Sequence, residues 1–175
     1  DSGDGNMINT VVKSSDYTDR YVTYDVLNDG FGQGALYTVV NQAENLPTMY
    51  QKFYVYKDMP YALVQVELGS DNEISTNFMA PISTSGENVV DIGTKTDARA
   101  LFVPFSNDGY TAYNPETLNG AHTSYFVTAI FDNNSRNSVI AGSVDHDTWK
   151  TGTSTWATAD NGNINFFGAF AGINS

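Results

Sequence analysis

Hydrophobic and polar positions alternate along much of the chain in short runs that are separated by turns. The clearest pair is 49–56 and 61–68, which a turn containing Asp and Pro connects. In the second run Val64, Val66 and Leu68 share one face of an extended strand, and the intervening residues share the other. A period of two with one apolar face is typical of a half-buried β-strand. This pattern predicts a β-hairpin over 49–68.

Similar runs recur about every ten residues, which is the spacing of a β-sandwich or barrel. No window keeps a 3.6-residue period, so we expect no long helix. The sequence predicts an all-β fold, an antiparallel two-sheet β-sandwich with roughly twelve strands, in a single domain over 1–175. The other strands are expected at 7–14, 20–27, 35–42, 98–105, 123–131, 138–145, 153–159 and 164–172.

The charge and composition of the chain exclude several classes of function. The 175 residues include 20 Asp and Glu, 8 Lys and Arg and no Cys, which gives a formal net charge of -12. So few cations cannot form the basic surface that nucleic acids or anionic membranes require. Without cysteine there is no disulfide, thiolate nucleophile or Cys-type metal site. The 18 Asn, 18 Thr and 11 Tyr favour strands and turns.

Candidates for catalysis and metal binding are few. His122 and His146 lie in no serine-hydrolase or zinc pattern. Asp145 and Asp147 would share a face if their segment were a strand, and paired carboxylates could serve a glycosidase. The segment 1–6, DSGDGN, has oxygen ligands but lacks the full spacing of a calcium loop. We therefore expect no cofactor and leave calcium open as an alternative.

Aromatic side chains beside amides and carboxylates are typical of sugar-binding sites, because a ring stacks on the apolar face of a sugar while polar groups bind its hydroxyls. The segment 107–114, NDGYTAYN, has this composition and lies in an expected loop. Trp156 is a further candidate ring. The candidate carbohydrate-binding residues are Asn107, Asp108, Tyr110, Tyr113, Asp147 and Trp149.

Three segments occur in an order that resembles a known family. They are FYVYKDMPYALVQVEL (53–68), RALFVPFSNDGYTAYN (99–114) and TSYFVTAIFDNNSRNSVIAGSVDHDTW (123–149), and Lys150-Thr151-Gly152 follows the last. The order resembles that of the N-terminal β-supersandwich domain of glycoside hydrolase family 36-type α-galactosidases and their relatives. Members of that family carry an MPY-like turn and a GSVxHDTWKTG-like segment in this order.

The resemblance implies an accessory role. In those enzymes two aspartates of a following (β/α)8 barrel perform catalysis, and these 175 residues are expected to hold neither. The family's loop after the LFVPF-like strand carries an acid and an aromatic, in a pattern like D-N-D-x-W, at the rim of the sugar pocket. Here Asp108 matches the acid and Tyr110 replaces the tryptophan.

The hypothesis is therefore a non-catalytic carbohydrate-binding β-sandwich domain of a glycoside hydrolase. Its expected partners are a neutral oligo- or polysaccharide and a catalytic domain in the same parent chain, in an extracellular or cell-surface setting. One alternative is a purely structural domain that packs on the catalytic barrel. A second is a stand-alone glycosidase that uses Asp145 and Asp147. An adhesin domain is also compatible with the composition.

Overall fold

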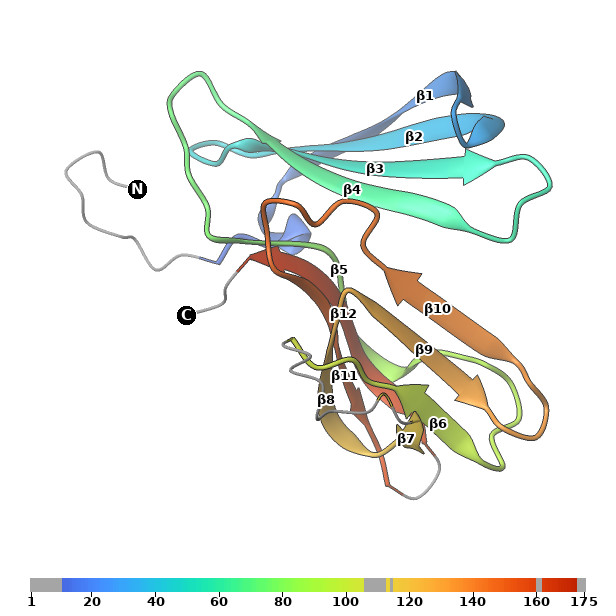
Figure 1. The fold of residues 1–175 in the computed structure, drawn as a ribbon. Helices are drawn as coiled ribbons and strands as arrows, with labels where there is room; N and C mark the ends of the chain where they lie inside the picture. Colours follow the sequence, from blue (N-terminus) through green and yellow to red (C-terminus); the bar gives the residue numbers. More distant parts are fainter. Residues whose placement is uncertain (1–10, 106–112, 114, 160–161, 173–175) are drawn as a thin grey trace. The chain divides into compact units, whose positions relative to one another are not determined.

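The structure is a computed structural model that describes residues 11–105, 113, 115–159 and 162–172. It divides into two compact units, Asp1–Thr76 and Asn77–Ser175, both built from antiparallel strands (Figure 1). The described residues form twelve strands and one short 3₁₀ helix, so the all-β prediction is confirmed. That the two units act as a single domain stays a prediction. No described helix has the length and apolar content needed to cross a bilayer.

Unit 1 contains the 3₁₀ helix η1 (Ser14–Asp16) and one four-stranded sheet, sheet A, in the order β1-β2-β3-β4. Each strand pairs with the next as a hairpin, including the predicted hairpin of β3 and β4. Asp58 in that turn has φ 58°, a left-handed conformation that Asp tolerates. The strands are β1 Asp19–Asp29, β2 Gly32–Gln42, β3 Thr48–Tyr56 and β4 Ala62–Gly69.

Tyr56 connects the two hairpin turns at one end of sheet A. Its hydroxyl donates to Oδ2 of Asp29 over 3.0 Å, and its ring lies against those of Phe31 and Tyr61. Burial, with the hydrogen bond to Asp29, raises the pKa of Tyr56 to about 12. The phenol therefore stays neutral and keeps donating its proton throughout the ordinary pH range.

Unit 2 contains two four-stranded antiparallel sheets. Sheet B has the order β5-β12-β11-β8, and sheet C has the order β10-β9-β6-β7. Strands distant in sequence are neighbours in both sheets, as in a sandwich with crossing connections. The strands are β5 Phe78–Val90, β6 Ala98–Leu101, β7 Pro115–Thr117, β8 Gly120–Tyr125, β9 Val127–Asp132, β10 Ser138–Gly142, β11 Thr151–Ala157 and β12 Ile164–Gly172.

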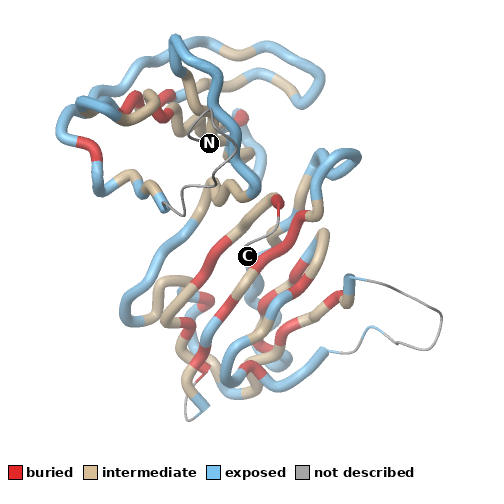
Figure 2. The backbone as a smooth tube through the Cα atoms, turned by 90° about the vertical axis from the view of Figure 1, so that its left-hand side faces the viewer, coloured by how far each residue is buried: buried red, intermediate tan, exposed pale blue. Residues whose placement is uncertain are grey.

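The core of unit 2 draws on both sheets. Ala100 and Ile130 come from sheet C, and Ala157, Ile164 and Phe167 come from sheet B. Figure 2 shows buried residues on several strands of unit 2, and β11 and β12 contain most of them. A core shared between two antiparallel sheets is a β-sandwich, as the sequence predicts.

The expected strand at 123–131 is in fact two strands that belong to different sheets. The chain leaves β8 of sheet B and enters β9 of sheet C at Phe126, which has φ 67°. A bulky residue seldom adopts this left-handed conformation. Here two backbone hydrogen bonds hold it, from Phe126 N–H to Thr151 O and from Ser143 N–H to Phe126 O. Alternation of side chains continues on both sides of the corner, so the sequence alone does not reveal it.

Three further strand predictions need correction. The expected strand at 98–105 ends at Leu101. In the range 7–14, residues 7–10 lie outside the described residues, residues 11–13 form no strand, and η1 begins at Ser14. The expected strand at 138–145 ends at Gly142, so Asp145 and Asp147 lie in a loop. The sequence analysis also missed β5 and β7. Glycine and polar residues interrupt β5, and β7 has only three residues.

Asp132 organises the loops at one end of the sandwich. This carboxylate is 0% exposed. Its Oδ1 accepts hydrogen bonds from the backbone N–H groups of Thr96 and Asp97, both over 2.7 Å. Its Oδ2 accepts from those of Asn134 and Ser135 over 3.2 and 2.7 Å. The backbone donors, that of Asp97 foremost, hold the pKa of the Asp132 carboxyl well below its ordinary value.

Substitution of Asp132→Asn should lower the melting temperature of unit 2 by several degrees or more, because an amide cannot accept at both positions. A carboxyl with a lowered folded-state pKa stabilises above its unfolded pKa of about 3.9, and that contribution is lost as the pH falls below about 4. The difference in melting temperature between Asp132→Asn and the wild type should therefore become smaller below about pH 4. Both tryptophans lie in unit 2, so their fluorescence reports its unfolding.

The matched control is Asp25→Asn, which removes an exposed carboxylate from sheet A. It should leave the unit 2 transition unchanged at every pH. An Asp132→Asn melting temperature equal to that of the wild type would show that the four hydrogen bonds do not hold these loops.

Candidate functional site

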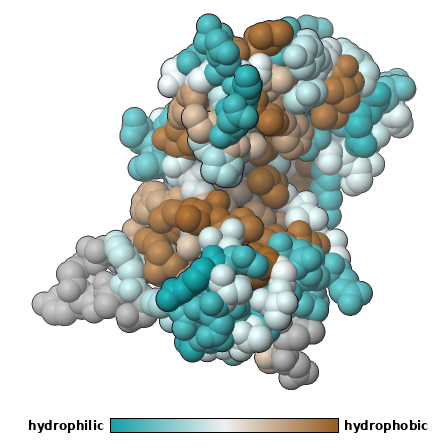
Figure 3. All heavy atoms as spheres, turned by 90° about the vertical axis from the view of Figure 1, so that its right-hand side faces the viewer, coloured by the Kyte–Doolittle hydropathy of each residue, from teal (hydrophilic) through white to brown (hydrophobic). Residues whose placement is uncertain are grey.

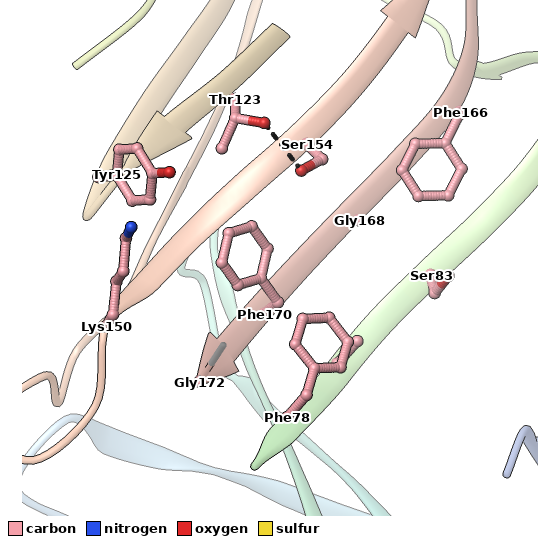
Figure 4. A pocket seen from close by; sticks show the side chains of 11 residues that line it. Phe78, Ser83, Thr123, Tyr125, Lys150, Ser154, Phe166, Gly168, Phe170 and Gly172 are labelled. Atoms are coloured by element: carbon pink, nitrogen blue, oxygen red, sulfur yellow. Dashed lines mark hydrogen bonds between the residues drawn. The ribbon is translucent and has the colours of Figure 1, made fainter. Parts of the chain in front are cut away.

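A groove lies on the face of sheet B that points away from the sandwich core (Figure 4). Its volume is about 540 Å³. The register of the four strands brings its residues together in rows, because directly paired residues point to the same side of a sheet. The lining consists of Phe78, Ala80, Ser83, Thr123, Tyr125, Lys150, Ser154, Phe166, Gly168, Phe170 and Gly172.

Glycines beneath two phenylalanine rings shape the floor of the groove. A Cβ at Gly152 would lie 2.8 Å from Cζ of Phe170, and one at Gly168 would lie 3.1 Å from Cζ of Phe166. Gly152 is the direct cross-strand partner of Phe170. The missing side chains thus let both rings lie close against the sheet. Phe78 stacks beside Phe170, with ring centroids 5.6 Å apart and planes inclined by 24°.

Sheet B carries aromatic rings on its outward face and several threonines among the apolar residues of its inward face. Toward the core, β11 presents Thr151, Thr153 and Thr155, all buried. The hydroxyl groups of Thr153 and Thr155 have no hydrogen-bond partner. Toward the outside the same sheet presents the aromatic rings of the groove. A buried hydroxyl without a partner costs about 1–3 kcal/mol. The two unpartnered hydroxyls therefore lower the folding stability of unit 2, while aromatic rings lie on the outward face of the same sheet.

Polar groups stand between the rings. Thr123 and Ser154 face each other on neighbouring strands with their hydroxyl oxygens 3.3 Å apart. At one end the Lys150 ammonium lies 4.1 Å from the ring centroid of Phe105 and 4.4 Å from that of Tyr125. Lys150 is the one charged residue among the described lining. The groove thus offers apolar surfaces and hydroxyl groups, with little net charge.

Both tryptophans are accessible. Trp156 is 44% exposed and lies on the groove side of sheet B, directly opposite Phe166 in the register. Trp149 is 50% exposed and lies in the loop 143–150, next to Lys150. The sequence analysis names both rings as candidates for sugar binding. The structure places both at the surface.

The residues that the sequence analysis proposed for sugar binding are only partly described. Asn107, Asp108 and Tyr110 lie outside the described residues. Tyr113 is 49% exposed, and Asp147 is exposed in the same loop as Trp149. Trp149 precedes the groove residue Lys150, which places the 143–150 loop beside the groove. No observation brings Tyr113 together with this loop.

The paired carboxylates are not arranged as a strand would arrange them. Asp145 and Asp147 belong to the loop 143–150, and Oδ1 of Asp145 accepts a hydrogen bond from the backbone N–H of Asp147 over 3.3 Å. That contact is an ordinary loop-stabilising turn. The expectation that both share a strand face is wrong, which removes the geometric support for a glycosidase pair.

The two histidines have separate surroundings. The ring of His122 stacks on Phe102 with centroids 4.2 Å apart, and it also contacts the backbone oxygen of Asn119. His146 Nδ1 lies 3.3 Å from Oγ of Ser143, which in turn lies 2.7 Å from Oγ1 of Thr151. The described residues contain no group of three or more His, Cys, Asp or Glu side chains that could hold a metal ion. The candidate calcium segment 1–6 lies outside the described residues.

The sequence analysis missed the groove although its signal is present. Phe166, Gly168, Phe170 and Gly172 follow each other at every second position, so one face of β12 carries alternating rings and glycines. The sequence analysis predicts the strand at 164–172 but does not consider which of its residues share a face. An aromatic residue beside a glycine two positions away, on a strand, is the pattern that could have identified the platform.

Comparisons of the chain with protein-family models, with curated proteins and with solved structures found no match.

Replacement of the unpaired Thr155 hydroxyl by a methyl group in Thr155→Val should stabilise unit 2 by about 1 kcal/mol, because the β-branched shape is kept and a buried polar group is removed. Thermal unfolding followed by tryptophan fluorescence measures the change. Thr155→Ser is the matched control, since it keeps the hydroxyl and loses the methyl group, and it should destabilise. If Thr155→Val destabilises instead, the hydroxyl has a partner such as a buried water molecule.

Proposed function

We propose that this chain is a non-catalytic carbohydrate-binding β-sandwich that holds a neutral oligo- or polysaccharide in the groove of sheet B. The observation that carries the proposal is the outward face of sheet B, where the rings of Phe166 and Phe170 lie close over glycines. Core packing alone does not account for aromatic rings on this outward face. A surface that must bind an apolar partner accounts for it.

The chemistry of the groove matches that of a sugar. Phe166 and Phe170 offer flat apolar surfaces to the C–H face of a pyranose ring. The hydroxyls of Thr123, Ser154 and Ser83 both donate and accept, as sugar hydroxyls do. Lys150 already contacts two rings, so the groove does not depend on an anionic ligand. These features support a neutral glycan.

The spacing of the rings indicates the size of the ligand. Phe166 and Phe170 are four residues apart on β12, which corresponds to about 13 Å along a strand. This distance exceeds a single pyranose ring, so a ligand that touches both platforms has at least two sugar units. We expect oligosaccharides to bind more tightly than the corresponding monosaccharide.

The setting that we propose follows from the resemblance in segment order. It is an accessory domain in a glycoside hydrolase of the family 36 type, at the cell surface or outside the cell, with catalysis in another domain of the parent chain. The residues of the 107–114 loop and the 143–150 loop would add contacts at the rim. Asn107, Asp108 and Tyr110 keep that role as a hypothesis.

A purely structural role is the second candidate, and one observation favours it. Large hydrophobic residues are open at the surface over more than one region (Figure 3), as expected where another domain packs. The exposure of Trp149 and Trp156 favours ligand binding, because a structural domain has no need of open tryptophan rings beside a groove. Hydrolysis of nitrophenyl glycosides by the purified chain would instead support an enzyme.

Removal of one platform by Phe170→Ala should weaken glycan binding at least tenfold, about 1.4 kcal/mol, because the stacking surface is lost. Isothermal titration calorimetry with oligosaccharides selected on a glycan array provides the measurement. Wild-type affinities should lie in the millimolar to micromolar range. Trp149→Ala tests the neighbouring loop, where a smaller loss is expected.

The matched control is Tyr21→Ala, which removes an exposed aromatic ring from sheet A, outside the groove. It should leave binding unchanged. Tryptophan fluorescence establishes that Phe170→Ala is folded. A wild-type chain without any glycan ligand, or equal loss in both variants, would contradict the proposal.

A further inference from the structure

The outward face of sheet B carries three successive rows of paired residues. Directly paired residues share a face, so the side chains of each row stand side by side across the strands. We call the rows the first ring row, the hydroxyl row and the second ring row. They are Ala121-Trp156-Phe166-Ser85, Thr123-Ser154-Gly168-Ser83 and Tyr125-Gly152-Phe170.

The two ring rows form two stacking platforms that are open on the same side of the sheet. In the first ring row Trp156 is 44% exposed and lies directly beside Phe166. In the second ring row Phe170 is stacked against Phe78, with ring centroids 5.6 Å apart. Alternate positions of a strand share a face, so both platforms point outward from sheet B. A ligand that lies on this face can therefore stack on both at once.

The two rings of β12 lean in different directions. Phe166 and Phe170 are four residues apart, which corresponds to about 13 Å along the strand. A Cβ at Gly168, between them, would lie 3.1 Å from Cζ of Phe166, so the Phe166 ring leans along the strand toward Phe170 (Figure 4). The Phe170 ring instead leans across the sheet over Gly152 of β11. The two stacking surfaces are therefore closer together than the backbone positions, with room for one sugar unit between two stacked units.

The hydroxyl row lies between the platforms, where that middle unit would be. The hydroxyl oxygens of Thr123 and Ser154 are 3.3 Å apart on one side of Gly168, and the exposed Ser83 lies on the other side. Glycine leaves the floor between them without a side chain. Each hydroxyl both donates and accepts, so the row can bind the hydroxyls of a sugar whichever face the sugar turns to the sheet.

Charge favours a neutral ligand on these rows. None of their residues is charged, and the ammonium of Lys150 at the end of the groove lies 4.1 Å from the ring centroid of Phe105 and 4.4 Å from that of Tyr125. A chain with a net charge of -12 repels polyanions at long range, and one ammonium that already contacts two rings does not offset this repulsion.

We infer that the groove binds a neutral, β-1,4-linked glycan in an extended conformation that runs along β11 and β12. Alternate units of such a chain turn the same face to one side. The first and third units then stack on the two platforms, and the second unit lies over the hydroxyl row. A helical α-1,4-linked chain turns its successive units away from a common plane and reaches only one platform. This inference rests on the proposed glycan binding and adds the linkage class and the orientation of the ligand.

The dependence of affinity on ligand length tests the inference. Isothermal titration calorimetry compares cello-, manno- and xylo-oligosaccharides of two to six units, which are β-1,4-linked, with α-1,4-linked malto-oligosaccharides of the same lengths. In at least one β-linked series the affinity should rise at least about tenfold between two and four units, because only the longer ligands reach both platforms. Further units should add little. The malto-oligosaccharides should show no such step.

A variant of one platform separates simultaneous stacking from a general loss of binding. Phe166→Ala should weaken binding of the tetrasaccharide at least about tenfold and that of the disaccharide no more than about twofold, since a disaccharide can still stack on Phe170. The matched control is Tyr21→Ala on sheet A, which should change neither affinity. Circular dichroism and tryptophan fluorescence check that both variants are folded.

Failure of this inference can be distinguished from failure of the proposed function. A wild-type chain that binds no glycan would overturn both. Glycan binding without a step in the β-1,4-linked series, tighter binding of malto-oligosaccharides, or an equal loss of disaccharide and tetrasaccharide binding in Phe166→Ala would overturn the extended-chain inference alone.

Discussion

Side chains of a β-strand alternate between the two faces of a sheet, and register carries that alternation into the neighbouring strands. This constraint determines what each sheet of the molecule offers to its surroundings. In sheet B it sends Thr153 and Thr155 inward and the rows of Phe166 and Phe170 outward. A shift of one residue would bury these rings but would expose the core residue Phe167 together with the threonines. The register that builds the core therefore also places the rings of the groove on the outward face.

The corner at Phe126 connects this constraint to the architecture of unit 2. The chain passes from sheet B to sheet C there, and the two backbone hydrogen bonds around Phe126 secure the change of direction. Thr151, which accepts one of them through its carbonyl, begins the strand that carries Gly152 and Ser154 into the groove. The strained corner is therefore hydrogen-bonded to the first residue of a strand that lines the groove.

Much of the fold was predictable from sequence because turns and alternation are local signals. The hairpin of β3 and β4 and the strands β11 and β12 follow directly from them. The break at Phe126 was not predictable, because alternation does not report which sheet a strand joins. The groove was also missed, since it depends on β12 pairing with strands far away in sequence. The paired position of Asp145 and Asp147 failed because β10 ends at Gly142.

The acidic side chains are distributed unevenly over the faces of the sheets. In sheet A all strand carboxylates lie on one face, and in the groove of sheet B the one charged residue among the described lining is a lysine. The strand carboxylates of sheet A thus leave its other face free of carboxylates, and none lines the groove among the described residues. Because a net charge of -12 makes copies of the chain repel one another, those surfaces can stay apolar without causing general aggregation. Net charge here does not select a ligand. It restricts contact to the few faces from which charge is absent.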